Sequence, residues 1–291
     1  MVRDTAAGPS NKWNVLPPGG GFVPGYRKRM PTVETRWRNA LPRPLAFVLS
    51  GGANLGAIQV GMLKALAEAG LHPDLVVGTS VGAINGAVIA DRGLAEGARV
   101  LEEIWRGLSR RHIFPGNWLA QARRLLSTRI SLFHQGELAS LICRHLTTGH
   151  IEQLRLPFGA LATDLLTDHG VLFTAGRIRP ALLASSAIPG IYPPVKIGGR
   201  LYVDGGLTAH VPLRPALKLG ATSIVVLDAG GNCHRPRPPR SITGMILASM
   251  NAILRQRVLV EAPAIAAEHP LLYLPTPCLM NMPVLGFEHT P

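Results

Sequence analysis

The sequence predicts an α/β fold: a three-layer α/β/α domain with a mostly parallel central sheet. Short apolar runs alternate with segments whose apolar residues recur at helical spacing, which is typical of parallel sheets. Glycine-rich turns join the first two apolar runs to the helices that follow them. With 291 residues, 47% hydrophobic and 16% charged, the chain is long enough for one well-buried α/β domain and too apolar for intrinsic disorder.

The first elements alternate between strand and helix. Short apolar runs at 45–49 and 75–77 predict buried strands. Helical spacing of apolar or small residues follows at 56–69, 83–90 and 94–108. The order strand–helix–strand–helix predicts parallel strands joined by right-handed crossovers.

Later elements are shorter and their connections are longer. Strand-like runs lie at 158–162, 171–174, 201–203 and 223–227. Residues 109–150 mix basic and apolar side chains and are expected to form short helices around the site. We expect an extended linker at 236–240, a helix near 242–261 and an irregular tail.

These elements divide the chain into three regions. Residues 1–43 are rich in Gly, Pro and basic side chains and predict a poorly structured basic extension. Residues 44–235 are expected to form the main α/β domain. Residues 236–291 are expected to supply a linker, a helix and a tail that pack on the same domain.

The formal net charge of +13 bears on the partners of the protein. Such a surplus favours polyanions, either nucleic acid or an anionic bilayer surface, although arginine-rich coding explains it equally well without a partner. Nucleic acid is not expected, because only 5% of residues are aromatic and no recognition motif stands out. Peripheral contact with an anionic membrane surface is the partner prediction that remains.

Cysteine use and apolar segments bear on the compartment. Cys143, Cys233 and Cys278 are odd in number and widely spaced, so they indicate neither a disulfide framework nor a zinc site. The first 14 residues hold no apolar core of a signal peptide, and the stretch 242–254 is too short to span a bilayer. We therefore expect a cytoplasmic protein, at most peripheral to a membrane.

Three turns carry residues suited to acyl chemistry, and the first is Gly78-x-Ser80-x-Gly82. It lies between a predicted strand and a predicted helix, where this pattern places a serine on a strained, exposed turn. The two glycines allow backbone and substrate to approach closely. The helix that begins there points its N-terminus toward developing negative charge.

The second turn is Gly51-Gly52-Ala53-Asn54-Leu55-Gly56, which also follows a strand and opens a helix. A dinucleotide fingerprint is excluded because Ala53 stands where its second glycine is required, and no Gly-Lys-Ser/Thr follows for a phosphate-binding loop. Backbone N–H groups at a helix N-terminus remain, and they predict an oxyanion hole formed by Gly51, Gly52, Ala53 and Asn54.

The third turn is Asp204-Gly205-Gly206, directly after the strand 201–203. A serine hydroxyl needs a base in order to act as a nucleophile at neutral pH, and a carboxylate within hydrogen-bond reach serves that purpose. An Asp-Gly turn by itself is common in loops. The Asp-Gly turn is informative in this sequence because it occurs together with the other two turns.

Together the three turns resemble the patatin-like phospholipase family over roughly residues 45–228. The resemblance rests on SGGANLGAIQVGML, GTSVGAING, the stretch SSAIPGIYPP at 185–194, and VDGGLTAHVPL, in that order. It implies that Ser80 is the nucleophile and Asp204 the base of a Ser–Asp dyad without histidine. It also implies a lipid ester as substrate, such as a phospholipid, lysophospholipid or neutral lipid, and no metal or other cofactor.

Two positions depart from the family pattern. The family usually has three consecutive glycines where this chain has Gly51-Gly52-Ala53, and usually an Arg or Lys where it has Leu55. A methyl group at Ala53 is tolerated if φ stays negative there. The N–H donors survive both changes, so the catalytic prediction stands.

Two alternatives stay open. A Ser-His-Asp esterase or thioesterase for soluble acyl groups would draw its histidine from those that follow Asp204, namely His210, His234, His269 and His289. A degenerate family member would instead bind lipid or a protein partner without turnover.

Overall fold

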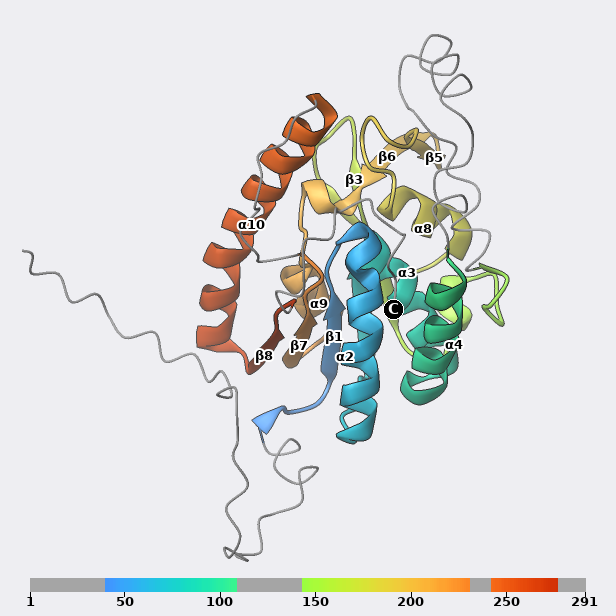
Figure 1. The fold of residues 1–291 in the computed structure, drawn as a ribbon, viewed down its shortest axis with the longest axis vertical. Coiled ribbons are helices and arrows are strands. Elements are labelled where there is room, and N and C mark those ends of the chain that lie inside the picture. Colours follow the sequence, from blue (N-terminus) through green and yellow to red (C-terminus); the bar gives the residue numbers. More distant parts are fainter. Residues whose placement is uncertain (1–39, 109–142, 231–241, 277–291) are drawn as a thin grey trace, which may run out of the picture.

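The computed structural model describes residues 40–108, 143–230 and 242–276. Within them, an eight-stranded sheet lies between helices on both faces (Figure 1). The strand order is β5-β6-β3-β2-β1-β7-β8, and β4 pairs with β3 outside this path. The predicted three-layer α/β/α class is therefore confirmed.

Parallel pairing joins the five strands from the middle of the sheet to its β8 edge. All contacts along β3-β2-β1-β7-β8 are parallel, whereas β4 and β6 pair antiparallel with β3, and β5 with β6. The strands are β1 (Leu45–Leu49), β2 (Leu75–Thr79), β3 (Phe158–Asp164), β4 (Gly170–Phe173), β5 (Val195–Ile197), β6 (Arg200–Asp204), β7 (Ser223–Leu227) and β8 (Leu271–Leu274).

The helices fall on the two faces of this sheet. They are η1 (Ala53–Leu55), α2 (Gly56–Glu68), α3 (Val81–Arg92), α4 (Leu94–Gly107), η2 (Ile151–Gln153), α8 (Ile178–Ser185), η3 (Gly205–Leu207), α9 (Leu213–Lys218) and α10 (Ile242–Glu268). Figure 1 shows α2 and α4 on one side of the molecule and α10 along the opposite margin.

Alternation along the central strands explains the two layers. In β1, Phe47 and its neighbours at alternate positions pack with the core of α2, α3 and α4, while Val48 packs with that of α9 and α10. Both cores are apolar, so β1, β2 and β7 are buried along their whole length. This is why these strands read in the sequence as continuous apolar runs.

Several elements were not expected from the sequence. The helices α8 and α9 and the short strand β5 fall in stretches without clear periodicity. Residues 271–274, expected to be part of an irregular tail, form β8 and pair in parallel with β7. The expected extension before residue 40, the short helices within 109–142 and the linker at 236–240 lie outside the described residues.

The long C-terminal helix raises the question of membrane insertion. None of the helices in the described parts of the chain combines the length and apolar character needed to cross a membrane. The helix α10 has Pro263 in its interior and extends to Glu268, beyond the end expected from the sequence.

Candidate active site

The three turns identified in the sequence meet at the end of the sheet where β1 and β2 have their carboxyl ends. The carboxyl ends of β1 and β2 lie side by side because these strands are parallel, so the glycine loop and Ser80 are neighbours. The strand β6 runs in the opposite direction, yet Asp204 reaches the same level as Ser80. The register shows this, since Thr79 pairs with Leu161 of β3 and Asp204 with the next residue of β3.

Ser80 occupies the strained turn that the sequence predicted. It has φ 56° and ψ −125° and lies between β2 and α3, with only 6% of its surface exposed. A Cβ atom on Gly78 would lie 2.3 Å from the carbonyl oxygen of Gly82, and one on Gly82 would lie 2.3 Å from that of Leu49. Only glycine fits these two positions, and a strained backbone of this kind costs about 1–3 kcal/mol.

Ser185 holds the backbone of this turn in place. Its hydroxyl accepts the N–H of Ser80 at 3.0 Å and donates to the carbonyl of Leu161 at 2.6 Å. Ser185 is the last residue of α8 and is fully buried. The stretch that begins with Ser185 contributes to the family resemblance, but the sequence alone predicted no role for this residue.

Asp204 is buried, and its two oxygens have different surroundings. Oδ1 accepts the N–H of Gly206 at 2.7 Å. Within the described residues Oδ2 has no partner of ordinary hydrogen-bond geometry, although the Ser80 hydroxyl is near enough to lower the pKa of the carboxyl. The contact between the two side chains is therefore looser than a fully formed hydrogen bond, as is common before substrate binds.

Burial sets the basicity of this carboxylate. It raises the pKa of Asp204 from 3.8 to about 6, and the hydrogen bonds from Ser80 and Gly206 oppose the rise. Gly205 is required at the next position, because a Cβ atom there would lie 2.1 Å from the carbonyl oxygen of Leu161. The turn thus fixes an unusually basic carboxylate beside a serine.

The glycine loop offers fewer amides than predicted. The N–H of Gly51 donates to the carbonyl of His210 at 3.1 Å, so the prediction that Gly51 is an oxyanion donor is corrected. Among the described residues, no acceptor contacts the N–H of Gly52 or Ala53. A Cβ atom on Gly52 would lie 2.6 Å from the carbonyl oxygen of Ala229, so a glycine is required there.

This geometry agrees with the comparison against known proteins. A family model described as patatin-like phospholipase matches residues 47–217, which is more than half of the chain. The chain belongs to the patatin-like phospholipase family. The matched range includes Ser80, Asp204 and the whole glycine loop at residues 51–56.

Relatives in the family share about a third of their aligned residues with this chain. Patatin-like phospholipase domain-containing protein 7 of Mus musculus is 31% identical over 189 residues, covering 64% of this chain and 14% of that protein. An uncharacterised NTE family protein of Mycobacterium tuberculosis is 31% identical over 201 residues, covering 68% of this chain and 52% of that protein. The neuropathy target esterase sws of Drosophila melanogaster is 31% identical over 191 residues, covering 64% and 13%. The chain thus spans about half, or far less, of these relatives.

The alanine that departs from the patatin-like pattern carries strain. Ala53 has φ 50°, so the condition of a negative φ, under which a methyl group is tolerated there, is not met. The left-handed region costs a residue with a Cβ atom about 1–2 kcal/mol. The N–H of Leu55 donates to the carbonyl of Gly52 at 3.0 Å, which closes the turn around Ala53. The glycine loop of this chain therefore carries backbone strain at Ala53.

A buried polar network supports the loop from below. The Gln59 amide donates to the Ser50 carbonyl at 3.0 Å, and the Asn85 amide donates to Gln59 Oε1 at 2.9 Å. Trp105 Nε1 donates in turn to Asn85 Oδ1 at 3.0 Å. These residues were missed in the sequence, although a glutamine among the apolar positions of a helix is a signal for such a network.

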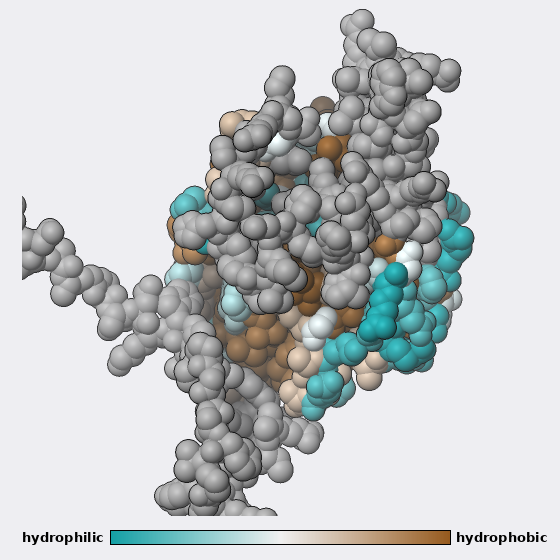
Figure 2. Space-filling view, viewed as in Figure 1, coloured by the Kyte–Doolittle hydropathy of each residue, from teal (hydrophilic) through white to brown (hydrophobic). Residues whose placement is uncertain are grey.

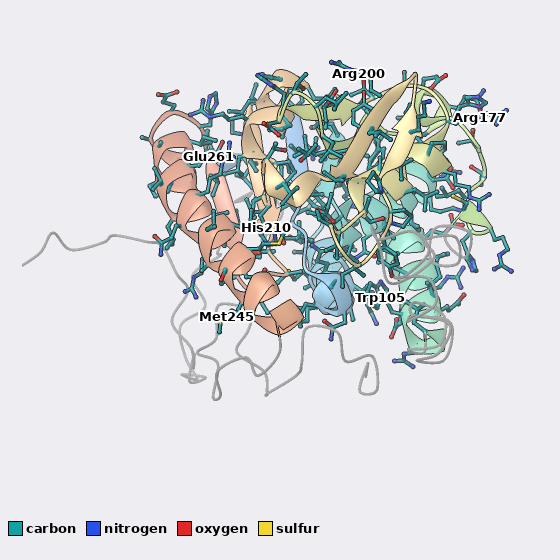
Figure 3. The ribbon with its side chains drawn as sticks, turned by 90° about the horizontal axis from the view of Figure 1, so that it is seen from above. Trp105, Arg177, Arg200, His210, Met245 and Glu261 are labelled. Atoms are coloured by element: carbon teal, nitrogen blue, oxygen red, sulfur yellow. The ribbon has the colours of Figure 1, made fainter. Side chains whose placement is uncertain are left out.

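His210 lies beside the glycine loop. Its Nδ1 atom is 3.1 Å from the point that a Cβ atom on Gly51 would occupy, and its Nε2 atom is 4.0 Å from Asp228 Oδ1. Burial lowers the pKa of the imidazole, against the effect of Asp228, so the ring is neutral at pH 7. Figure 3 shows His210 in the interior, on the inner side of α10.

Among the described residues, His269 is not brought to the site. His269 precedes β8, at the amino end of the parallel strands, whereas Ser80 follows the carboxyl end of β2. His234 and His289 lie outside the described residues. Of the four histidines considered from the sequence, only His210 is shown near Ser80.

Proposed function

We propose that the protein hydrolyses carboxylic esters of lipids through an acyl-Ser80 intermediate, with Asp204 as the base. The observation that carries this proposal is the position of the Asp204 carboxylate. It is buried, its Oδ1 atom accepts a hydrogen bond from Gly206, and the Ser80 hydroxyl is near enough to oppose the rise in its pKa. A carboxylate with a pKa of about 6 is ionised at pH 7 and is a stronger base than an exposed one.

The reaction follows from these positions. Asp204 takes the proton as Ser80 Oγ attacks the ester carbonyl, and the negative charge develops on the carbonyl oxygen. The N–H groups of Gly52 and Ala53 are positioned to donate hydrogen bonds to that oxygen, and the N-terminus of α3 adds a favourable field. The alcohol then leaves with the proton from Asp204. In the second half, Asp204 deprotonates a water molecule that releases the acid from Ser80.

The family supports lipids as the substrate class. The relatives carry the names phospholipase and esterase, and the blocks around Ser80 and Asp204 are those that define the resemblance. A phospholipid, a lysophospholipid or a neutral lipid all supply a carboxylic ester of this kind. The dyad requires no group beyond these side chains, backbone amides and water.

One structural observation favours a second candidate mechanism. His210 and Asp228 form a pair next to Gly51. A Ser-His-Asp hydrolase would need such a histidine and carboxylate near its serine. Against it, the contact that lowers the pKa of Asp204 comes from Ser80, while Asp228 is the charged group that acts on His210. We therefore favour the Ser–Asp dyad.

Labelling with a fluorophosphonate probe tests the proposal. Wild type should react, Ser80→Ala should not, and Asp204→Asn should react roughly 10²–10⁴-fold more slowly. His210→Gln separates the two mechanisms: the dyad predicts a rate within tenfold of wild type, whereas a triad predicts a loss as large as that of Asp204→Asn. The rate of wild type should rise as the pH increases through about 6, the pKa of Asp204. A folded wild-type chain that does not react would point to a binding protein instead.

A further inference from the structure

The large apolar side chains that stay exposed are not scattered over the surface. Within the described residues they fall on three segments: α10, the turn between β3 and β4, and η3. The turn contributes Leu165 and Leu166, at 44% and 74% exposure, and η3 contributes Leu207 at 38%. Large exposed apolar patches on a protein usually mark a surface that binds a partner.

The helix α10 contributes most of this surface. Its inner face packs against the sheet through Val258, Ala262 and Ile265. On the opposite face Met245 is 52% exposed, Ile253 69% and Val260 74%. These three residues are spaced by eight and seven positions, so they lie along one side of the helix. A surface helix normally presents polar side chains there, and α10 presents an apolar stripe.

The helix that carries this stripe contacts the proposed catalytic turn through its inner face. Leu254 Cδ1 lies 3.9 Å from the point that a Cβ atom on Gly206 would occupy, and Gly206 is the residue whose N–H anchors Asp204. The hydroxyls of Thr163 and Thr208 are 3.2 Å apart, which ties the end of β3 to the residue after η3. Figure 1 shows the start of α10 and the loops beyond β3 and β6 at the same, upper end of the molecule.

Basic side chains border the stripe. Arg255 and Arg257 are exposed on α10 on either side of it. Glu261, near the middle of the second half of the helix, is paired with Arg214 at 3.2 Å, so its charge is balanced. Figure 2 shows brown, apolar surface next to teal, hydrophilic surface along the left margin, where α10 runs. Figure 3 shows how Met245 and Glu261 mark the two ends of this stretch of the helix.

We propose that the outer face of α10, with Leu207 and the β3–β4 turn, docks the protein on an anionic phospholipid bilayer. Apolar side chains enter the boundary between headgroups and acyl chains, while arginines bind lipid phosphates. The net charge of +13 favours the same surface. Because Leu207 directly follows Gly206, docking that includes Leu207 brings the turn that carries Asp204 near the lipid. The inference rests on the proposed function in one respect, since the bilayer is then also the source of substrate.

The test measures binding apart from turnover. Ser80→Ala protein of full length is sedimented with phosphatidylcholine vesicles, with and without phosphatidylserine, so that no lipid is consumed. The double substitution Ile253→Asp with Val260→Asp should weaken binding roughly 10²-fold, because two apolar side chains and a favourable charge are lost. The matched control, Ala65→Asp with Ala95→Asp, adds the same charge to exposed positions of α2 and α4 and should bind like the parent.

Further arms distinguish this partner from others. Binding should weaken at high salt and in Arg255→Gln with Arg257→Gln, because the attraction to phosphatidylserine is screened or removed. Absence of binding by the parent, or equal binding by the Ile253/Val260 variant, overturns the proposal. So does a concentration-dependent dimer of the parent that the variant lacks and that does not bind vesicles, since the stripe would then serve a second copy.

A soluble short-chain ester keeps the two proposals separable. In the otherwise wild-type chain, the Ile253/Val260 variant should hydrolyse that ester at the wild-type rate while losing activity on vesicles. Because both side chains are exposed, thermal unfolding of the variant should match that of the parent. Vesicle binding by a protein that never labels at Ser80 would leave the docking surface standing and remove the catalytic proposal.

Discussion

Two aspartates lie at the ends of strands in this molecule and make the same local turn. Asp204 is the last residue of β6 and accepts the N–H of Gly206 at 2.7 Å, and Asp228 follows β7 and accepts the N–H of Gly230 at 2.7 Å. Their second oxygens differ. Asp228 Oδ2 accepts the Tyr273 hydroxyl at 2.7 Å, whereas Asp204 Oδ2 has no hydrogen-bond partner among the described residues, and the Ser80 hydroxyl lies near this carboxyl.

The difference separates a structural carboxylate from a reactive one. Both oxygens of Asp228 accept hydrogen bonds, so neither is left to take a proton from a neighbouring group. Asp204 keeps one oxygen for a proton, and burial raises its pKa to about 6. The two turns share the same local hydrogen bond but differ in chemistry, because the second oxygen of Asp228 accepts a hydroxyl and that of Asp204 does not.

Exchanging each carboxylate for an amide should break the comparison most strongly. Asp204→Asn removes the proposed base and should lower turnover of a lipid ester roughly 10²–10⁴-fold. Asp228→Asn leaves Ser80 and Asp204 in place and should lower it less than tenfold. Steady-state hydrolysis by the two variants, with folding checked by circular dichroism, decides the matter. A loss of turnover as large in Asp228→Asn would instead support a His210–Asp228 relay.

The residue after each aspartate sharpens the comparison further. Gly205→Ala forces a methyl group against the carbonyl of Leu161, which a Cβ atom would approach to 2.1 Å, and should destabilise the fold by about 3 kcal/mol. The corresponding position in the other turn already holds an alanine. Ala229→Gly should therefore cost only about 1 kcal/mol, mainly through greater freedom of the unfolded chain. Urea unfolding measures both values, and equal losses would contradict the packing described for Gly205.

The smallest expected effect concerns stability and pH. The pKa of Asp204 is higher in the folded protein, about 6, than its ordinary value of 3.8, so the folded state binds the proton more tightly. Its contribution is present below pH 4 and is lost as the pH rises through about 6. Asp204→Asn keeps the oxygen that accepts from Gly206 and removes the buried charge.

This variant should therefore gain stability on the order of 2 kcal/mol at pH 8, and little at pH 4. Asp228→Asn is the control and should lose stability at both values, because Tyr273 and Gly230 donate to its carboxylate. Unfolding free energies at the two pH values test the sign. A loss of stability by Asp204→Asn at pH 8 would show that the carboxylate is better solvated than its 7% exposure indicates.

Sequence reasoning predicted the parts of the fold that have strong local signals. The strands 45–49 and 223–227 have the predicted bounds, because continuous apolar runs describe strands buried on both faces. The strand β8 was missed, since its residues are half-buried at the sheet edge and its partner β7 lies far away in the chain. Ser80 and Asp204 were expected on turns because glycines flank Ser80 and two glycines follow Asp204.

By itself, then, the sequence determined the fold class, the family and the strained serine turn. Each of these predictions depends on residues that are close together in the chain. The glycines of the turns are required because there is no space for a Cβ atom at their positions. Only the tertiary structure decided which groups meet across long separations. The partner of the Ser80 amide is Ser185, the Gly51 amide is occupied by His210, and Ala53 is held in a left-handed conformation. These contacts arise because the parallel sheet brings distant turns to one edge, and no local pattern encodes which of their polar atoms will face each other.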